Sequence, residues 1–278
     1  MKKKISILGC GWLGLPLAER LVEKGNSVKG STTSVEKIPV LKKKAIAPYL
    51  LKFDAARNYQ IKKEEEDFFN CDILIINIPP KVRTLGDLDH PKQIDSIIDY
   101  IKKHKIRKVV YVSATSVYPS NCEIVDENTP ISISDTGNTA LFEAERRFWS
   151  EEAFESIVLR CGGLLGYDRI PGRYYVGRTI STGNTPVNYI HRDDVIRIIE
   201  LVVDKKFSGR LYNLVAPVHP SRKEVFSKNA KDFGFEAPVF IDNPEQSEKK
   251  KLILGRRVME ELAYQFLFPD PLDFYFTP

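Results

Sequence analysis

The sequence has few of the features that mark secreted, membrane-spanning or metal-binding proteins. Only four of its 278 residues are cysteine, and they show neither metal-ligand spacing nor a disulfide framework, so we expect reduced thiols and no metal. No segment approaches the roughly 18 consecutive apolar residues of a membrane span. These shortages favour a cytoplasmic protein with no membrane partner.

The sequence also has little excess of one sign of charge over the other. The formal net charge is +5 at pH 7, and short lysine clusters alternate with acidic residues along the chain. Domains that bind nucleic acid gather their basic residues into a patch or stripe. Solvated surfaces therefore explain the lysines better than a nucleic-acid groove, and we expect no nucleic-acid partner.

The N-terminus imitates a secretory or lipoprotein signal. Three lysines follow Met1, and an apolar run ends at Cys10. This run is too short for the hydrophobic core of a signal peptide, and its residues form the pattern of a first β-strand. We therefore expect no signal peptide here.

The most informative stretch is a GxGxxG pattern that follows an apolar strand at residues 5–8 and opens a helix. The first glycine permits a tight turn, the second lets the backbone approach a pyrophosphate, and the third lets the helix pack on the strand. The free N–H groups of the helix then face the phosphates. A glycine turn that packs a helix without a ligand is the alternative. The pattern predicts a dinucleotide site at Gly9, Cys10, Gly11, Trp12, Leu13 and Gly14.

The turn after the second predicted strand, residues 27–31, favours NADP over NAD. An NAD site places an acidic residue about 20 positions beyond the glycines, whereas a 2'-phosphate is bound by hydroxyls and a cation. No acidic residue comes before Glu36. The place is taken by Ser31, Thr32, Thr33 and Lys37. NADP is the predicted cofactor, with NAD as the alternative, and a solvated helix cap would explain the same hydroxyls.

Further apolar runs and helical spacings alternate along the chain. We expect strands at residues 49–53, 73–78, 108–112, 157–161 and 211–215, and helices at 93–104, 139–152 and after 191–194. The alternation predicts an α/β Rossmann-type fold with a doubly wound parallel sheet of about seven strands. Ligands bind at the carboxyl ends of such strands. Further cofactor contacts are therefore expected at Asp54, Ile78, Pro79, Pro80, Ser113 and Gly162.

The remaining chain predicts a smaller, discontinuous C-terminal lobe. Residues 164–188 are rich in Gly, Pro, Tyr and Arg and lack periodicity. We expect a dinucleotide-binding domain at 1–163, completed by 189–216, and a substrate-covering lobe at 164–188 and 217–278. Substrate contacts are expected at Tyr167, Asn188 and His191, although a backbone-bonded, structural His191 is favoured over an acid-base role.

Several motifs in order resemble the extended or atypical short-chain dehydrogenases/reductases of the NAD-dependent epimerase/dehydratase type. They are the glycine turn, Asp54 after the third strand, a "SxxxVY" stretch at 113–118, an "IHVDD"-like segment at 188–194, and residues 211–213. The GxGWLG form of the turn and the proline pair after the fourth strand are similar to a small, YeeZ-like atypical subgroup. The resemblance implies an oxidoreductase or epimerase acting on a sugar-like or small carbonyl substrate.

Two departures from the family pattern concern catalysis. The position of the family's catalytic Ser or Thr is Ala114 here, and the positions of its YxxxK tyrosine and lysine are Gly137 and Leu141. One possibility is an enzyme with another proton donor, for which Thr115 and Ser116 are the catalytic candidates. The alternative is a non-catalytic, NADP-binding redox sensor or regulator. In either case we expect a monomer or homodimer.

Overall fold

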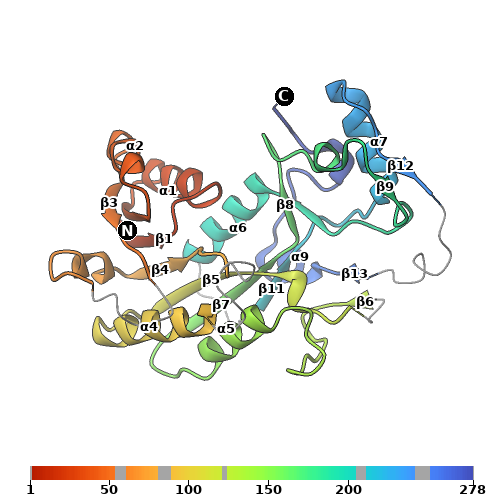
Figure 1. The fold of residues 1–278 in the computed structure, drawn as a ribbon. Helices are drawn as coiled ribbons and strands as arrows, with labels where there is room; N and C mark the ends of the chain where they lie inside the picture. The colour runs from red at the N-terminus through yellow and green to blue at the C-terminus, as the bar shows by residue number, and fades with distance from the viewer. Residues whose placement is uncertain are drawn as a thin grey trace. The chain divides into compact units, whose positions relative to one another are not determined.

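The structure is a computed structural model that describes residues 2–53, 61–80, 89–120, 124–204, 211–241 and 251–277 (Figure 1). The chain divides into two compact units that are interleaved along the sequence. The first comprises Met1–Val117, Asn138–Leu159 and Val202–Arg210, and the second comprises Tyr118–Gly137, Arg160–Leu201 and Leu211–Pro278. The domain boundaries predicted from the sequence stay a prediction.

The principal sheet has seven strands in the order β11-β7-β5-β4-β1-β2-β3. Their bounds are β1 Lys4–Leu8, β2 Ser27–Thr32, β3 Ala47–Leu50, β4 Ile73–Ile76, β5 Lys108–Ala114, β7 Glu155–Cys161 and β11 Leu211–Leu214. The pairs β1 with β2, β1 with β4, β2 with β3 and β4 with β5 are all parallel. The Rossmann-type α/β fold predicted from the sequence is confirmed.

The order of strands reverses at β1 and β4, which is where open α/β sheets bind ligands. The helices are α1 Gly14–Glu23, α2 Ile38–Lys43, α4 Asp89–Lys103, α5 Thr139–Trp149, α6 Arg192–Asp204, α7 Arg222–Phe233 and α9 Arg256–Leu262. Within the first unit, α1 and α2 lie on one face of the sheet and α4 and α5 on the other (Figure 1). The two apolar signals that predicted this layering are the fully buried β4 and the buried isoleucine face of α4.

The bounds of β3 and β5 differ from the prediction. β3 begins and ends earlier than residues 49–53, because it is the edge strand of the sheet, partly exposed throughout, and therefore lacks a strong apolar pattern. β5 continues to Ala114, so Ser113 lies within the strand. His191 ends a short strand, and α6 begins at the next residue, with the His191 ring accepting the Asp193 N–H of its first turn.

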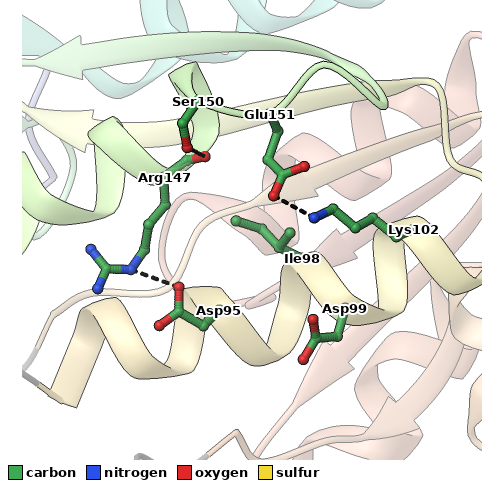
Figure 2. Close-up of a pocket in the computed structure, with 7 residues that line it drawn as sticks. All are labelled: Asp95, Ile98, Asp99, Lys102, Arg147, Ser150 and Glu151. Carbon is green, nitrogen blue, oxygen red and sulfur yellow. Dashed lines mark hydrogen bonds and ion pairs between the residues drawn. The ribbon is translucent and has the colours of Figure 1, made fainter.

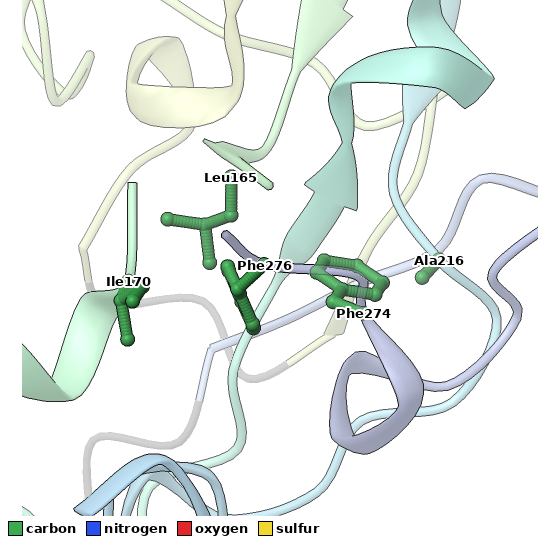
Figure 3. Close-up of a cluster of buried hydrophobic side chains, with 5 residues drawn as sticks. All are labelled: Leu165, Ile170, Ala216, Phe274 and Phe276. Atoms are coloured by element: carbon green, nitrogen blue, oxygen red, sulfur yellow. The ribbon is translucent and has the colours of Figure 1, made fainter. Parts of the chain in front are cut away.

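The second unit contains three short parallel pairs, β8 with β10, β9 with β12 and β6 with β13. Their bounds are β6 Ile124–Val125, β8 Gly163–Leu165, β9 Thr179–Ile180, β10 Tyr189–His191, β12 Val239–Phe240 and β13 Leu252–Ile253. One of its buried apolar clusters joins the segment after β8 to the C-terminal residues (Figure 3). Its members are Leu165, Ile170, Ala216, Phe274 and Phe276.

Five short 3-10 turns complete the described elements: η1 Val35–Lys37, η2 Glu66–Phe69, η3 Thr115–Val117, η4 Pro171–Tyr175 and η5 Pro271–Asp273. Over the described ranges, none of the helices combines the length and the apolar character needed to cross a membrane.

Candidate functional site

The turn between β1 and α1 requires glycine at two positions and leaves open space at a third. Gly9 has a φ of 103°, and a Cβ there would lie 2.4 Å from the carbonyl oxygen of Asn77. A Cβ at Gly14 would lie 2.2 Å from the carbonyl oxygen of Gly9, so the close packing of α1 on the turn excludes any side chain. No atom lies within 4 Å of the Cβ position at Gly11. These are the three conditions that a turn holding a pyrophosphate needs.

Hydrogen bonds from both neighbouring strands hold this turn. The Gly9 N–H donates to Ser31 Oγ at 2.9 Å, and the Cys10 N–H donates to the Ser31 carbonyl at 2.8 Å. From β4, the Asn77 side-chain amide donates to the Gly9 carbonyl at 3.1 Å. Ser31, predicted as a cofactor contact, therefore fixes the turn with its buried hydroxyl.

The hydrogen-bond donors that the glycine turn offers to a ligand are backbone N–H groups. Leu13 is buried in the core and Trp12 is half-buried. The N–H groups of Leu13 and Gly14 find no acceptor among the described residues, and the first turn of α1 carries no acidic side chain. Burial raises the pKa of the Cys10 thiol to about 12, so this cysteine stays protonated beside the turn. The arrangement suits an anion bound by backbone N–H groups.

The loop after β2 presents a cation, Lys37, that has no partner among the described residues. Thr32 is buried and accepts the Ser34 N–H at 3.1 Å, whereas Thr33 is exposed. The Ser34 hydroxyl hydrogen-bonds the Glu36 carboxylate and lowers its pKa. Lys37 is exposed, and its ammonium makes no ion pair or hydrogen bond within the described part of the chain. Thr33 and Lys37 are therefore both available to a ligand.

The residues predicted at the end of β4 lie against the glycine turn. The Asn77 N–H donates to the Leu8 carbonyl at 2.9 Å, which carries the strand pairing one residue beyond β4. Ile78 follows, with its Cγ2 3.3 Å from the Cβ position of Gly9. Pro79 is exposed and Pro80 is half-buried. Asp54, predicted near the adenine, lies outside the described residues.

The hydroxyl cluster at the end of β5 separates into two kinds of residue. Ser113 is buried and donates to Glu145 Oε1 at 2.5 Å, so its hydroxyl ties β5 to α5. Thr115 is 7% exposed, and its hydroxyl makes no hydrogen bond among the described residues. Ser116 is exposed and accepts the side-chain N–H of Asn138 at 3.3 Å. Only the hydroxyls of Thr115 and Ser116 remain for chemistry.

The start of α5 shows what replaces the family's tyrosine and lysine. Gly137 precedes the helix and is exposed, and Leu141 is buried in the first turn. Between them, Asn138 caps the helix by accepting the Leu141 N–H at 3.1 Å. The sequence prediction missed Asn138, although asparagine before a helix is a strong capping signal.

In the second unit, Tyr167 lies in a cluster with the first residues of α6. Its hydroxyl donates to Asp193 Oδ2 at 2.9 Å, and the Arg192 guanidinium lies 3.8 Å from its ring centroid. Burial and the Asp193 carboxylate raise the pKa of Tyr167, so the phenol keeps its proton. Tyr167 has a φ of 53°, an uncommon conformation for a residue with a side chain.

His191 is held by backbone groups at both ring nitrogens. Nδ1 accepts the Asp193 N–H at 3.2 Å, and Nε2 donates to the Tyr275 carbonyl at 3.1 Å. The ring is fully buried, and burial lowers its pKa. This geometry fits the structural role that the sequence favours over an acid-base role.

Asn188 and Gly162 also lie together in the second unit. A Cβ at Gly162 would lie 2.5 Å from the Asn188 carbonyl oxygen. The Asn188 side chain donates to the Lys251 carbonyl and accepts the Ile253 N–H, both at 2.8 Å. The amide therefore connects β10 to the segment around β13, and the ligand contacts predicted for these two residues stay predictions.

An open pocket between α4 and α5 contains none of the predicted site residues (Figure 2). Its lining is charged, and two ion pairs cross it, Arg147 with Asp95 at 2.7 Å and Lys102 with Glu151 at 2.5 Å. Four of its charged groups are engaged with one another in these two pairs, so the glycine turn remains the candidate site of the first unit.

Comparison with known proteins finds a relative of similar length, protein YeeZ. No family model matches the sequence. The chain is 33% identical over 273 residues to protein YeeZ of Escherichia coli, which covers 97% of this chain and 98% of YeeZ.

Solved structures show the same fold at lower identity. One is the UDP-glucuronic acid 4-epimerase of Bacillus cereus in complex with UDP-glucuronic acid and NAD, with a TM-score of 0.77 and 16% identity, covering 97% of this chain and 96% of that chain. Another is the Bordetella bronchiseptica enzyme WbmG in complex with NAD, with a TM-score of 0.76 and 16% identity, covering 98% and 92%.

Proposed function

Because this chain belongs to the YeeZ-like subgroup of the extended short-chain dehydrogenases/reductases, we propose that it binds NADP(H) and acts as an oxidoreductase or epimerase on a sugar-like or small carbonyl substrate. The observation that carries the proposal is the glycine turn, held from two strands and open at Gly11. The protein would work in the cytoplasm as a monomer or homodimer, with no nucleic-acid partner.

In this proposal the cofactor lies along the carboxyl edge of the first unit's strands. The pyrophosphate would lie over Gly11 and accept hydrogen bonds from the N–H groups of Leu13 and Gly14. The 2'-phosphate would lie near Thr33, an exposed hydroxyl, and Lys37, an exposed cation without a partner in the part of the chain that the structure describes. The other residues predicted to contact the cofactor would support the glycine turn or flank the nucleotide. They are Gly9, Cys10, Trp12, Ser31, Thr32, Asp54, Ile78, Pro79, Pro80, Ser113 and Gly162.

The cofactor would supply a hydride, and the chain would orient the substrate and handle the proton. Thr115 and Ser116 are the candidate donors, because the neighbouring Ser113 hydroxyl is engaged with Glu145. Tyr167, Asn188 and His191 are the substrate-side candidates, and of these Tyr167 is half-buried and carries a hydroxyl that keeps its proton.

Replacing Lys37 with alanine should weaken NADPH binding by about 1 to 3 kcal/mol and leave NADH binding nearly unchanged. The reason is the loss of one charge-assisted contact to the 2'-phosphate, which NADH lacks. The measurement is a fluorescence titration of both reduced nucleotides. Lys24→Ala is the matched control, because Lys24 is equally exposed but lies at the C-terminal end of α1. Equal losses for the two nucleotides, or equal affinities in the parent protein, would contradict the NADP preference.

A second candidate function is a redox sensor or regulator that binds NADP without turnover. The observation that favours it lies at the start of α5, at the positions of the family's catalytic tyrosine and lysine. Gly137 offers no side chain there, and Leu141 is buried. A sensor would bind the nucleotide but oxidise no NADPH with any keto-sugar, whereas the proposed enzyme would show slow oxidation.

A further inference from the structure

Three buried polar side chains in the first unit, Tyr111, His90 and Gln93, form a continuous hydrogen-bonded path, the polar bridge. The Tyr111 hydroxyl lies 2.8 Å from His90 Nε2, and His90 Nδ1 lies 3.3 Å from Gln93 Oε1. Gln93 Nε2 donates to the Phe53 carbonyl at 3.1 Å. Tyr111 and His90 are fully buried, and Gln93 is 7% exposed. The polar bridge therefore connects β5, through the start of α4, to the segment that follows β3.

The direction of each bond in the polar bridge follows from the Phe53 carbonyl, which can only accept. The Gln93 amide must turn its N–H groups toward Phe53 and its oxygen toward His90. That oxygen requires a proton on His90 Nδ1. Burial lowers the pKa of His90 to about 4, so at neutral pH the ring is uncharged and Nε2 accepts the Tyr111 hydroxyl. The polar bridge therefore has a single arrangement of donors and acceptors.

Phe53, at the end of the polar bridge, is restrained twice. Its carbonyl accepts the Gln93 N–H, and its ring packs edge-on against Phe69 and Tyr100, with centroids 6.3 and 6.2 Å away. A buried polar network in which every member has a partner makes its surroundings rigid. Apolar side chains of the same size would leave the Phe53 carbonyl without this donor. The polar bridge therefore fixes the backbone at Phe53.

The segment after β3, residues 51–53, borders the loop that is proposed to hold the 2'-phosphate. The Leu51 N–H donates to the Thr32 carbonyl at 3.0 Å, so the segment runs beside the end of β2, one residue before Thr33. In NADP the 2'-phosphate and the adenine are carried by the same ribose. A nucleotide whose 2'-phosphate lies at Thr33 and Lys37 would therefore bring its adenosine to this end of the sheet.

We propose that His90 and Gln93 are positioning residues for the adenosine half of the cofactor and act through the Phe53 backbone. This inference rests on the proposed function, because it requires a nucleotide at the carboxyl edge of the first unit. Neither side chain touches the nucleotide. The polar bridge holds the segment in its binding conformation beforehand, so binding costs less ordering. The next residue in the chain is Asp54, a predicted cofactor contact.

Two substitutions break the polar bridge at different points. Gln93→Leu removes the donor to Phe53 at nearly constant size, and His90→Phe removes the link between Tyr111 and Gln93 while keeping a ring. Ser156→Ala is the matched control, because the Ser156 hydroxyl is buried and donates to the Phe148 carbonyl at 3.1 Å. This control loses a buried hydrogen bond at the amino end of β7, so it reports the effect of lower stability alone.

The probe is 2',5'-ADP, which is the adenosine half of NADP with its 2'-phosphate, titrated alongside NADPH into variants that circular dichroism shows to be folded. We expect about fivefold weaker binding of both in Gln93→Leu and His90→Phe, the effect of about one lost hydrogen bond, and parent-like binding in Ser156→Ala. Parent-like 2',5'-ADP binding in Gln93→Leu, or an equal loss in Ser156→Ala, would overturn the inference. A parent protein that binds neither nucleotide would refute the proposed function, and the inference with it.

Nitrogen-15 NMR of the His90 ring tests the polar bridge in the parent protein, and so also decides the case of variants that do not fold. We expect a proton on Nδ1 and none on Nε2 at neutral pH. A proton on Nε2 would contradict the direction of the bonds and overturn the inference.

Discussion

NADPH oxidation by this protein against UDP- or dTDP-linked keto-sugars should be about a hundredfold to ten-thousandfold slower than in relatives that keep the tyrosine and lysine pair. General acid-base catalysis contributes about that factor. In such a pair the lysine charge also lowers the tyrosine pKa, and neither effect is available from Gly137 and a buried Leu141. The hydroxyls of Thr115 and Ser116 are weaker acids and depend on exchange with solvent.

Stopped-flow measurement of NADPH oxidation tests this expectation, with Thr115→Ala and Ser116→Ala as the variants that should slow it further. A useful control is Ser113→Ala, whose hydroxyl is bonded to Glu145 and should affect stability more than rate. Fast oxidation in the parent that survives both Thr115→Ala and Ser116→Ala would show that the active site lies elsewhere.

Alanine substitutions at Gly9 and Gly11 should affect different properties: Gly9→Ala should lower the stability of the fold, and Gly11→Ala should weaken nucleotide binding. Gly9→Ala forces a side chain onto a φ of 103° and to 2.4 Å from the Asn77 oxygen, which should cost about 2 to 6 kcal/mol of unfolding free energy. That is a large fraction of a domain's usual stability of about 5 to 15 kcal/mol. Gly11→Ala meets no atom within 4 Å, so the fold should remain, while its methyl group occupies the space over which the pyrophosphate would lie.

Urea unfolding and NADPH titration together separate these effects. Gly11→Ala should unfold like the parent but bind NADPH at least tenfold more weakly, a loss of roughly 1.4 kcal/mol or more. Gly25→Ala is a control for backbone strain alone, because Gly25 has a φ of 84° but no atom near its Cβ position. Parent-like NADPH affinity in Gly11→Ala would remove the turn from the binding site.

The elements predicted most accurately are those whose sequence carries its own physical signal. The isoleucine run of β4 and the glycine turn before α1 are local patterns, and the structure places both as expected. The predicted bounds of β3 lay too late in the sequence, because an edge strand needs no continuous apolar run to mark it. The end of β5 was placed too early because Ser113 is polar, and only its partner Glu145, 32 residues later, allows it to be buried in the strand.

The same limit applies to the candidate site. A sequence shows that hydroxyls gather after a strand, but the partner of each hydroxyl depends on elements that are distant in the chain. Ser31 is committed to the Gly9 N–H, whereas Thr33 remains exposed two residues later. His191 could be placed near α6 from its motif, but its bond to the Tyr275 carbonyl arises only in the folded chain.

A crystal structure with NADPH tests the proposed cofactor site most directly. We expect the pyrophosphate over Gly11, with the N–H groups of Leu13 and Gly14 donating to it, and the 2'-phosphate within hydrogen-bond distance of Lys37 and Thr33. A nucleotide bound away from the glycine turn, or one whose 2'-phosphate contacts neither Lys37 nor Thr33, would contradict the proposal.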